Sequence, residues 1–361
     1  MNTTANYFAR TYAEAREGFL AAAKQRGLAV ETTLNPLQGA QGEELATDAV
    51  LLGKADAQSL LIVTSGTHGV EGLCGSGCQR ALLGDEDLAK RVEASGIALL
   101  LVHAVNPYGF SHLRRVNEDN VDMNRNFRDF SDSSELNPAY AQVHDLMLPP
   151  EWPPSDANRA AIFASIGRMG MPAFQAAVSA GQRSHKDGLF YCGNAPTWSN
   201  RTVRALLQKH GAGRKSIGWI DIHTGLGPYG HGEKIFAGAN DAAELARAKA
   251  WWGADIMSYY EGKSASAEVQ GSMVMSIYAE CPKAEVTGMG LEFGTVPFEA
   301  VLTALRGDHW LAIHPQAGSG KRDVIRKTMR DAFYIDSDDW RGMVLGQSRT
   351  SVLQAVLSLG R

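Results

Sequence analysis

The stretch LLIVTSGTHGVEG, residues 60–72, joins an apolar run to a polar turn in which a histidine and a glutamate stand three positions apart. The run Leu60–Val63 is typical of a buried strand, and His68 and Glu71 follow it directly. A pattern as short as HxxE recurs by chance in many chains, so alone it fits a polar turn as well as a metal site. The segments around it must decide between the two.

Further short apolar runs surround this stretch and are followed by turn residues. They are AVLL (49–52), IALLLVHAV (97–105), IGWIDIH (217–223) and VTGMGLEF (286–293). A segment of helical character, residues 73–94, separates the runs at 60–65 and 97–105. This β-α-β order predicts an α/β fold of three α/β/α layers around a central mixed, largely parallel twisted sheet.

Helical patterns are also present outside this core. They cover residues 7–26, 242–258, 297–313 and the C-terminal thirty residues. Residues 131–200 differ in texture, with LPPEWPPSD at 148–156, and predict an insertion carried on the sheet core. We therefore expect a single catalytic domain over residues 1–361, with the insertion and the loop GLGPYGHGEK (225–234) shaping its pocket.

The composition argues against several classes of partner. Lys and Arg number 35 against 39 Asp and Glu, without a concentrated basic run, so nucleic acid is not an expected partner. The N-terminus lacks a signal-peptide pattern, and no stretch approaches the ~20 apolar residues that cross a bilayer, so we expect a cytoplasmic protein without membrane contact. Its four cysteines form no CxxC pair and are expected to be reduced and buried.

Polar side chains occupy the ends of several predicted strands, where open α/β sheets bind their ligands. His68 and Glu71 follow one strand and His223 ends another, and two imidazoles with one carboxylate form a common catalytic zinc site. Glu292 stands in a further strand and could deprotonate a water molecule. His68 alone would more simply be a loop histidine, so the zinc interpretation depends on the set.

The segment NPYGFSHLRRVNEDNVDMNRNF, residues 106–127, strengthens that interpretation. With THGVEG before it and DIH after it, this segment resembles the zinc carboxypeptidase (M14-like) superfamily, whose motifs stand in the same order. More narrowly, with DIHTGLGPYG it resembles an uncharacterised bacterial branch described only as a domain of unknown function, DUF2817. GLEFGT (290–295) also has the character of the aspartoacylase and succinylglutamate desuccinylase group.

The resemblance implies a role for each matching residue. His68, Glu71 and His223 would bind one zinc ion per subunit, and Asp122 would accept a hydrogen bond that orients the ring of His68. Arg115, nine positions before Asn124, would stabilise the oxyanion of the tetrahedral intermediate, with Arg114 as the neighbour most easily confused with it.

The resemblance also implies residues that bind the substrate and move a proton. Asn124 and Arg125 would grip a substrate carboxylate, for which a guanidinium fork is suited. Alternatively, Arg125 could pair with an internal acid such as Glu118 or Asp119. Glu292 would be the general base, and Tyr278, fourteen residues before it, could supply the tyrosine that peptidases of the superfamily carry near the base.

These implications predict a zinc-dependent hydrolase that cleaves an amide bond next to a carboxylate, either a metallocarboxypeptidase or an N-acyl amino acid deacylase. Its substrate would be a small molecule or a short peptide with a free carboxylate. The alternative is a non-catalytic ligand-binding protein that retains the fold, although no ligand or base is missing.

Three other patterns are given no catalytic role. CGSGC (74–78) lacks the spacing of a serine nucleophile elbow and is expected to allow close helix packing. AGSGKR (317–322) lacks the full phosphate-loop pattern and is interpreted as a turn. His309 and His314 are expected to have packing or surface roles.

Overall fold

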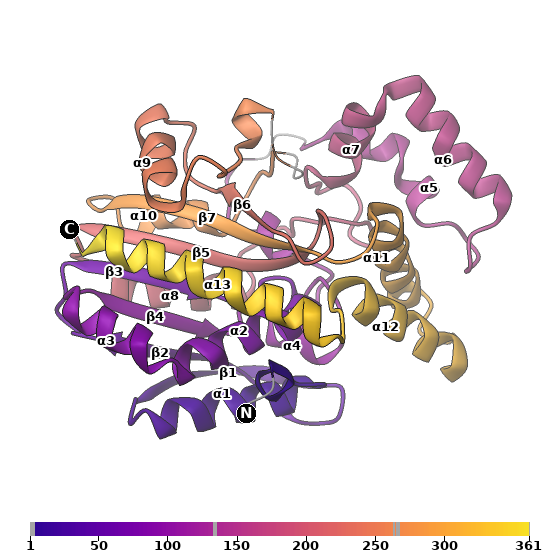
Figure 1. The fold of residues 1–361 in the computed structure, drawn as a ribbon. Coiled ribbons are helices and arrows are strands. Elements are labelled where there is room, and N and C mark those ends of the chain that lie inside the picture. The colour runs from indigo at the N-terminus through magenta and orange to yellow at the C-terminus, as the bar shows by residue number, and fades with distance from the viewer. Residues whose placement is uncertain (1–3, 133–135, 263, 265–267, 361) are drawn as a thin grey trace.

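A computed structural model describes residues 4–132, 136–262, 264 and 268–360 of the chain. Within these residues, seven strands form one mixed sheet in the order β1-β2-β4-β3-β5-β7-β6 (Figure 1). The strands are β1 (Val30–Gln38), β2 (Glu44–Gly53), β3 (Ser59–Thr64), β4 (Ala98–His103), β5 (Ser216–Gly225), β6 (Gly232–Phe236) and β7 (Glu285–Gly294). The central strands β4, β3, β5 and β7 are parallel to one another, and β1, β2 and β6 add antiparallel pairings at the two edges.

Helices cover both faces of the sheet. They are α1 (Tyr12–Gln25), α2 (Gly72–Gly84), α3 (Glu86–Ala94), α4 (Pro107–Ser111), α5 (His144–Met147), α6 (Asp156–Met169), α7 (Met171–Ser179), α8 (Trp198–Gly211), α9 (Ala242–Trp252), α10 (Ile277–Glu280), α11 (Phe298–Ile313), α12 (Ser319–Phe333) and α13 (Asp338–Leu359). Short 3-10 helices are η1 (Thr4–Tyr7), η2 (Gly69–Glu71), η3 (Met123–Arg125), η4 (Pro138–Gln142), η5 (Tyr259–Glu261) and η6 (Val274–Ser276).

Alternation of side chains along the central strands creates two separate cores. Leu61 and Val63 of β3 pack with residues of α1, α2, α3, α9 and α13, whereas Leu60 and Ile62 pack on the other face with residues of α8 and α10. Because successive residues of a strand point to opposite faces, a strand buried on both sides must be apolar throughout. The predicted three-layer α/β/α fold with a mixed sheet is confirmed, and α13 crosses one face of the sheet in Figure 1.

Several element boundaries differ from the sequence-based expectation. The helical segment 73–94 is two helices, α2 and α3, because Asp85 ends the first and its side chain accepts a hydrogen bond from Leu88 N to cap the second. The helix expected over 242–258 ends at Trp252, where Gly253 takes a positive φ of 101°. The stretch AGSGKR is not only a turn, since α12 begins at Ser319.

Two strands of the sheet, β1 and β6, were not predicted from the sequence. β1 is an edge strand with mostly exposed or half-exposed residues and a proline at position 36, so it lacks the continuous apolar run of the central strands. β6, with the sequence GEKIF, lies partly inside the stretch that was interpreted as the loop 225–234. That loop therefore ends at His231.

The predicted insertion forms a lobe beside the sheet (Figure 1). Residues 133–135 of this stretch lie outside the described residues. The lobe contains η4, α5, α6 and α7, and it joins the body through an apolar cluster that includes Phe174 and Val178 of α7, Val301 and Leu305 of α11 and Met329 of α12. The division into one domain with an insertion stays a prediction.

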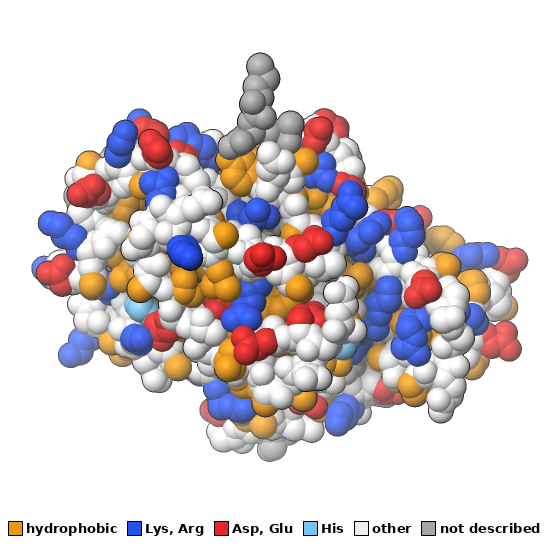
Figure 2. Space-filling model, turned by 90° about the horizontal axis from the view of Figure 1, so that it is seen from below, with side chains coloured by type: hydrophobic (Ala, Val, Ile, Leu, Met, Phe, Trp, Pro, Cys, Tyr) orange, Lys and Arg blue, Asp and Glu red, His pale blue; other side chains and the backbone are white. Residues whose placement is uncertain are grey.

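Lys and Arg side chains are interspersed with Asp and Glu on the face shown in Figure 2. In the described part of the chain, no helix combines the length and the apolar character that crossing a membrane requires. The four cysteines are buried and free, as expected.

The buried histidines of the fold predict a dependence of stability on pH. His103 stacks on Phe19 with ring centroids 4.7 Å apart, its Nε2 lies 2.9 Å from Ser76 Oγ, and burial lowers its pKa to about 4. The unfolded chain binds the proton near pH 6.5, so stability is lost as the pH falls from 6.5 towards 4. Urea unfolding of His103→Gln should show a slope shallower by up to ~1.4 kcal/mol per pH unit in this window.

The matched control is His231→Gln, because His231 is exposed. Its unfolding free energy should keep the slope of the natural chain. Equal slopes for the natural chain and His103→Gln would show that His103 is not held neutral by burial.

Candidate metal centre and cavity

The loop that carries His68 and Glu71 begins where β3 ends and is fixed by backbone hydrogen bonds. The amides of Gly69 and Val70 donate to the carbonyls of Arg115 and Arg114, at 3.1 and 2.8 Å. A Cβ added at Gly69 would lie 2.0 Å from the backbone carbon of Gly109 in α4, so only glycine fits there. The HxxE loop and the arginine pair therefore lie against each other, although they are far apart in the chain.

His223 and Glu292 come from neighbouring parallel strands. The two residues are register partners in the pairing of β5 with β7, near the carboxyl ends of both strands. Both line the same cavity, together with His68 and Glu71. The end of an open α/β sheet at which ligands bind thus carries all four groups that the sequence singled out for zinc and proton chemistry.

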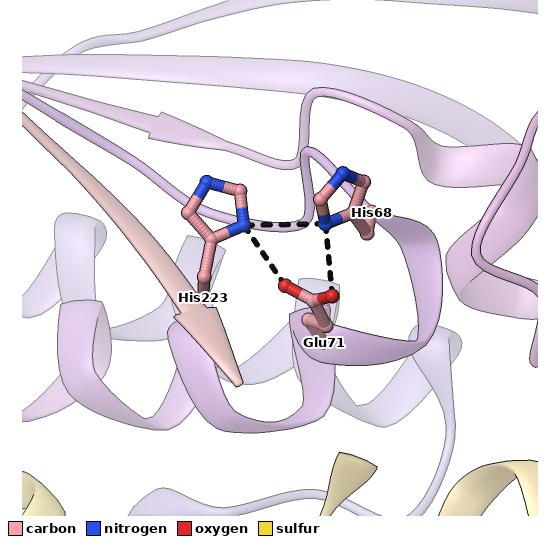
Figure 3. A group of neighbouring side chains, drawn as sticks. All are labelled: His68, Glu71 and His223. Atoms are coloured by element: carbon pink, nitrogen blue, oxygen red, sulfur yellow. Dashed lines mark hydrogen bonds and ion pairs between the residues drawn. The ribbon is translucent and has the colours of Figure 1, made fainter. Parts of the chain in front are cut away.

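The three expected zinc ligands meet in one buried cluster (Figure 3). His68 Nδ1 lies 2.8 Å from Glu71 Oε1 and 3.2 Å from His223 Nδ1, and His223 Nδ1 lies 3.0 Å from Glu71 Oε2. One ligand atom from each residue lies within 4.8 Å of the others. Two imidazole nitrogens and a carboxylate that converge in this way form a donor set that suits zinc with a fourth position left open.

Each histidine has a carboxylate behind its second nitrogen. Asp122 Oδ1 lies 3.3 Å from His68 Nε2, and Asp221 Oδ2 lies 2.6 Å from His223 Nε2. Such carboxylates fix the tautomer that leaves the other nitrogen free to bind a metal. The sequence predicts Asp122 in this position, whereas it gave no role to Asp221.

Asp221 could have been assigned from the sequence. It stands two residues before His223 on the same strand, so both side chains point to the same face. Its Oδ1 accepts hydrogen bonds from Thr64 Oγ1 at 2.6 Å and from Thr67 Oγ1 at 2.8 Å. These threonines, from the end of β3 and the loop after it, hold the carboxylate in place for the ring.

The electrostatics of the cluster favour a positive charge at its centre. Burial would raise the pKa of Glu71, but His68 and His223 outweigh it and lower this pKa to about 2. Burial opposes protonation of His223, but Asp221 and Glu71 outweigh it and raise the pKa of this ring well above its usual value. The carboxylates that favour this proton would also favour a bound cation, which would displace the proton from the ring.

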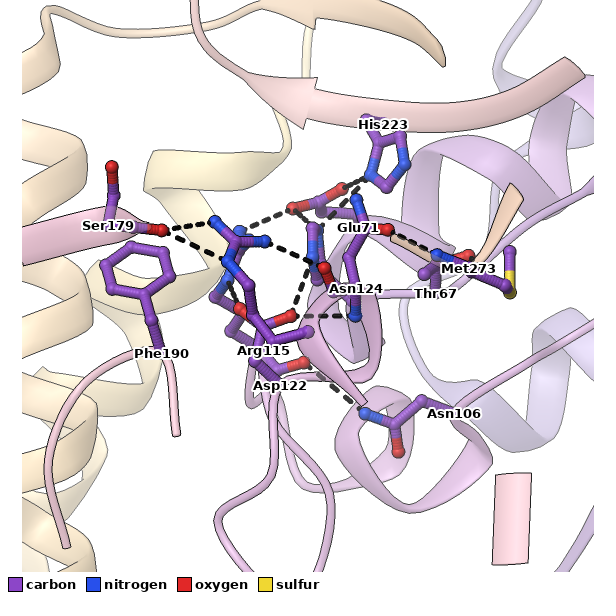
Figure 4. Close-up of polar contacts among 12 residues, drawn as sticks. Thr67, Glu71, Asn106, Arg115, Asp122, Asn124, Ser179, Phe190, His223 and Met273 are labelled. Atoms are coloured by element: carbon purple, nitrogen blue, oxygen red, sulfur yellow. Dashed lines mark hydrogen bonds and ion pairs between the residues drawn. The ribbon is translucent and has the colours of Figure 1, made fainter. Parts of the chain in front are cut away.

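The two adjacent arginines point to different partners. Arg115 lines the cavity, donates from Nε to Asp122 Oδ2 at 2.9 Å and lies 3.5 Å from Glu71 Oε1 through Nη1 (Figure 4). Arg114 turns away and donates from Nε to Asp308 Oδ1 at 3.1 Å. Arg115 is therefore the arginine next to the metal cluster, and Arg114 anchors the loop to α11.

Asn124 and Arg125 also border the cavity. Asn124 Oδ1 accepts a hydrogen bond from Met273 N at 2.9 Å. Arg125 is buried, and it donates from Nε and Nη2 to the carbonyl of Ser179 at the end of α7 and from Nη1 to Asn124 O. Each Nη carries a second N–H beyond these contacts. The contacts of Arg125 are with carbonyls of the described residues rather than with Glu118 or Asp119.

Glu292 differs from the expected ligand Glu71 in the direction in which its pKa is shifted. Its Oε1 accepts a hydrogen bond from Leu226 N at 2.9 Å. Burial and the nearby charge of Glu71 raise its pKa to about 7. A carboxylate with such a pKa can both accept and return a proton near neutral pH.

Tyr278 does not take the place of a tyrosine at the site. Its hydroxyl donates to Glu244 Oε1 at 2.5 Å and accepts from Ala239 N at 3.0 Å, outside the cavity lining. Tyr259, which the sequence analysis did not single out, does line the cavity. The spacing of fourteen residues before Glu292 was therefore a misleading signal.

The remaining patterns have packing roles, as expected. In the CGSGC helix, a Cβ at Gly75 or Gly77 would collide with Ser65 or Phe8, so these glycines permit close contact. His309 is buried and His314 stacks on Trp310 with ring centroids 4.1 Å apart.

The cavity next to the metal cluster has a volume of about 1310 Å³, including space open to solvent. Its walls are largely apolar, and the lobe contributes Met171, Phe174, Val178 and Phe190 to them. The predicted role of the insertion in shaping the pocket thus has a structural basis. Of the loop 225–234, Gly225 and Leu226 reach the cavity.

Comparison with solved structures finds similar proteins at low sequence identity. Bovine thrombin-activatable fibrinolysis inhibitor, in complex with tick carboxypeptidase inhibitor, is 12% identical with a TM-score of 0.51, and the match covers 98% of this chain and 97% of that one. A carboxypeptidase A from Helicoverpa armigera is 13% identical (TM-score 0.45; 96% and 74% covered). A metallo-carboxypeptidase from Pseudomonas aeruginosa is 14% identical (TM-score 0.47; 98% and 71% covered).

The bovine structure confirms the carboxypeptidase A-like fold. A search of curated proteins found no match. The family model described as "Protein of unknown function (DUF2817)" matches residues 8–347, and the chain therefore belongs to this family.

Proposed function

We propose that this protein is a zinc-dependent hydrolase of amide bonds. The observation that carries the proposal is the position of Glu292, a carboxylate outside the ligand set that stands in register with the expected ligand His223. A binding protein needs the ligands alone, whereas hydrolysis also needs a group that moves a proton. The alternative of a non-catalytic ligand-binding protein leaves Glu292 without a role.

In the proposed reaction the side chains divide the work. A bound zinc ion would supply Lewis-acid chemistry to the carbonyl and to a water molecule. Glu292 accepts a proton as the water attacks the carbonyl carbon, and it passes this proton to the amine nitrogen as the C–N bond breaks. Arg115, fixed by Asp122, faces the negative charge that develops on the carbonyl oxygen.

The proposed substrate carries a free carboxylate close to the scissile amide. Arg125 and Asn124 border the same cavity as the metal cluster, and the second N–H groups of the Arg125 fork are suited to a carboxylate. Both a peptide with a free C-terminus and an N-acyl amino acid meet this requirement. The fold match supports peptide-like substrates in general, and the proposal rests on the site rather than on the names of similar proteins.

The role of Glu292 predicts a separation of metal binding from turnover. Glu292→Gln should bind as much zinc as the natural protein but lose hydrolysis by a hundredfold or more, because the amide cannot accept the proton. Zinc content by elemental analysis and release of free amine from N-acyl amino acids measure the two properties. The control is Glu285→Gln at the opposite end of β7, which is exposed. Full turnover in Glu292→Gln would rule out this residue as the base.

Binding of the substrate carboxylate by Arg125 predicts that KM depends more on the charge of the substrate than on its size. Amidation of the substrate carboxylate should raise KM tenfold or more, since charge-assisted hydrogen bonds contribute about 1.5–3 kcal/mol. Arg125→Lys keeps the charge but loses the fork, so it should retain only part of the affinity, whereas Arg201→Lys at an exposed position should retain all of it. Equal KM values for free and amidated substrates would remove Arg125 from the substrate site.

A further inference from the structure

Two helices present matching stripes of side chains to the cavity. The stripes consist of residues at positions i, i+3, i+4 and i+7, which lie on one face of a helix. On α7 they are Met171, Phe174, Gln175 and Val178, and on α11 they are Phe298, Val301, Leu302 and Leu305. We call the part of the cavity between them the α7–α11 groove.

The groove leads from the surface to the site. Met171 and Phe298, at the start of the two stripes, are 51% and 44% exposed, whereas Phe174, Val178, Val301 and Leu305, further along, are all buried. Val178 and Leu305 line the same cavity as the metal cluster. An elongated group whose inner end lies near the metal cluster can therefore extend outwards along both helices and end at the surface.

The chemistry of the groove selects an alkyl chain over a peptide. Among the eight described residues of the two stripes, only Gln175 has a polar side chain. A peptide backbone placed here would leave N–H and C=O groups without partners, which costs free energy for each group. An alkyl chain has no such groups and gains from every methylene that leaves water.

We propose that the α7–α11 groove binds the alkyl chain of an N-acyl amino acid, with the chain end at Met171 and Phe298. This inference rests on the proposed function, in which the substrate can be either a peptide with a free C-terminus or an N-acyl amino acid. It assigns the deacylase branch of that function and gives the lobe a role in choosing the acyl chain. It also explains why large apolar side chains stay exposed at the mouth of the cavity.

Binding rather than turnover tests the proposal. The probes are N-acetyl-, N-hexanoyl- and N-decanoylglycine, titrated calorimetrically into zinc-loaded Glu292→Gln, which is expected not to hydrolyse them. Affinity should rise about fourfold for each methylene that enters the groove, which corresponds to ~0.8 kcal/mol per methylene. An affinity that does not depend on chain length would overturn the proposal.

Variants at the mouth locate the chain. Met171→Gln combined with Phe298→Gln should weaken decanoylglycine at least tenfold and leave acetylglycine unchanged, because only the long chain reaches these residues. The control is Phe163→Gln, since Phe163 of α6 is 65% exposed and does not line the cavity. Unchanged decanoyl binding in the double variant would also overturn the proposal.

The proposal and the hydrolase function can fail separately. Chain-length-dependent binding without any hydrolysis by the natural protein would contradict the hydrolase and leave the groove assignment standing. Hydrolysis of acyl amino acids together with length-independent binding would contradict the groove assignment and leave the hydrolase function standing.

Discussion

Buried negative charge is the constraint on which the site depends. Glu71, Asp122, Asp221 and Glu292 lie together at the ends of the central strands, and Arg115 and Arg125 are the guanidinium groups near them in the described structure. When all four carboxylates are ionised and both imidazoles are neutral, as metal binding requires, the two arginines leave two negative charges uncompensated. Buried charges of this kind must be paired or coordinate a metal, and a divalent cation between His68, Glu71 and His223 matches the deficit.

The fold meets this constraint by bringing together segments that are distant in the chain. Parallel pairing sets His223 beside Glu292, and backbone hydrogen bonds hold the HxxE loop against the segment that carries Arg115. Thr64 and Thr67 then orient Asp221, and Asp221 orients His223. Each carboxylate thus has a fixed partner before any ligand arrives, which reduces the reorganisation that binding requires.

The sequence predicted the part of this arrangement that follows from strand ends and spacing. A buried central strand needs a continuous apolar run, so the positions of His68, His223 and Glu292 at one edge of the sheet could be anticipated. Edge strands such as β1 need no such run and were missed. The stripes of α7 and α11 were equally hidden, because helical spacing indicates a buried face without indicating what the face meets. Tyr259 lines the cavity and Tyr278 does not, because sequence distance from Glu292 does not determine which side chain reaches the cavity.

The zinc content of the chain, purified without added metal, tests the metal centre most directly. Elemental analysis should find about one zinc per chain in the natural protein and little in His68→Ala, because the loss of one of three ligands leaves an incomplete site. His103→Gln, which changes a buried histidine outside the cluster, should retain the metal. Zinc well below one per chain, at a level that His68→Ala leaves unchanged, would contradict a metal centre at His68, Glu71 and His223.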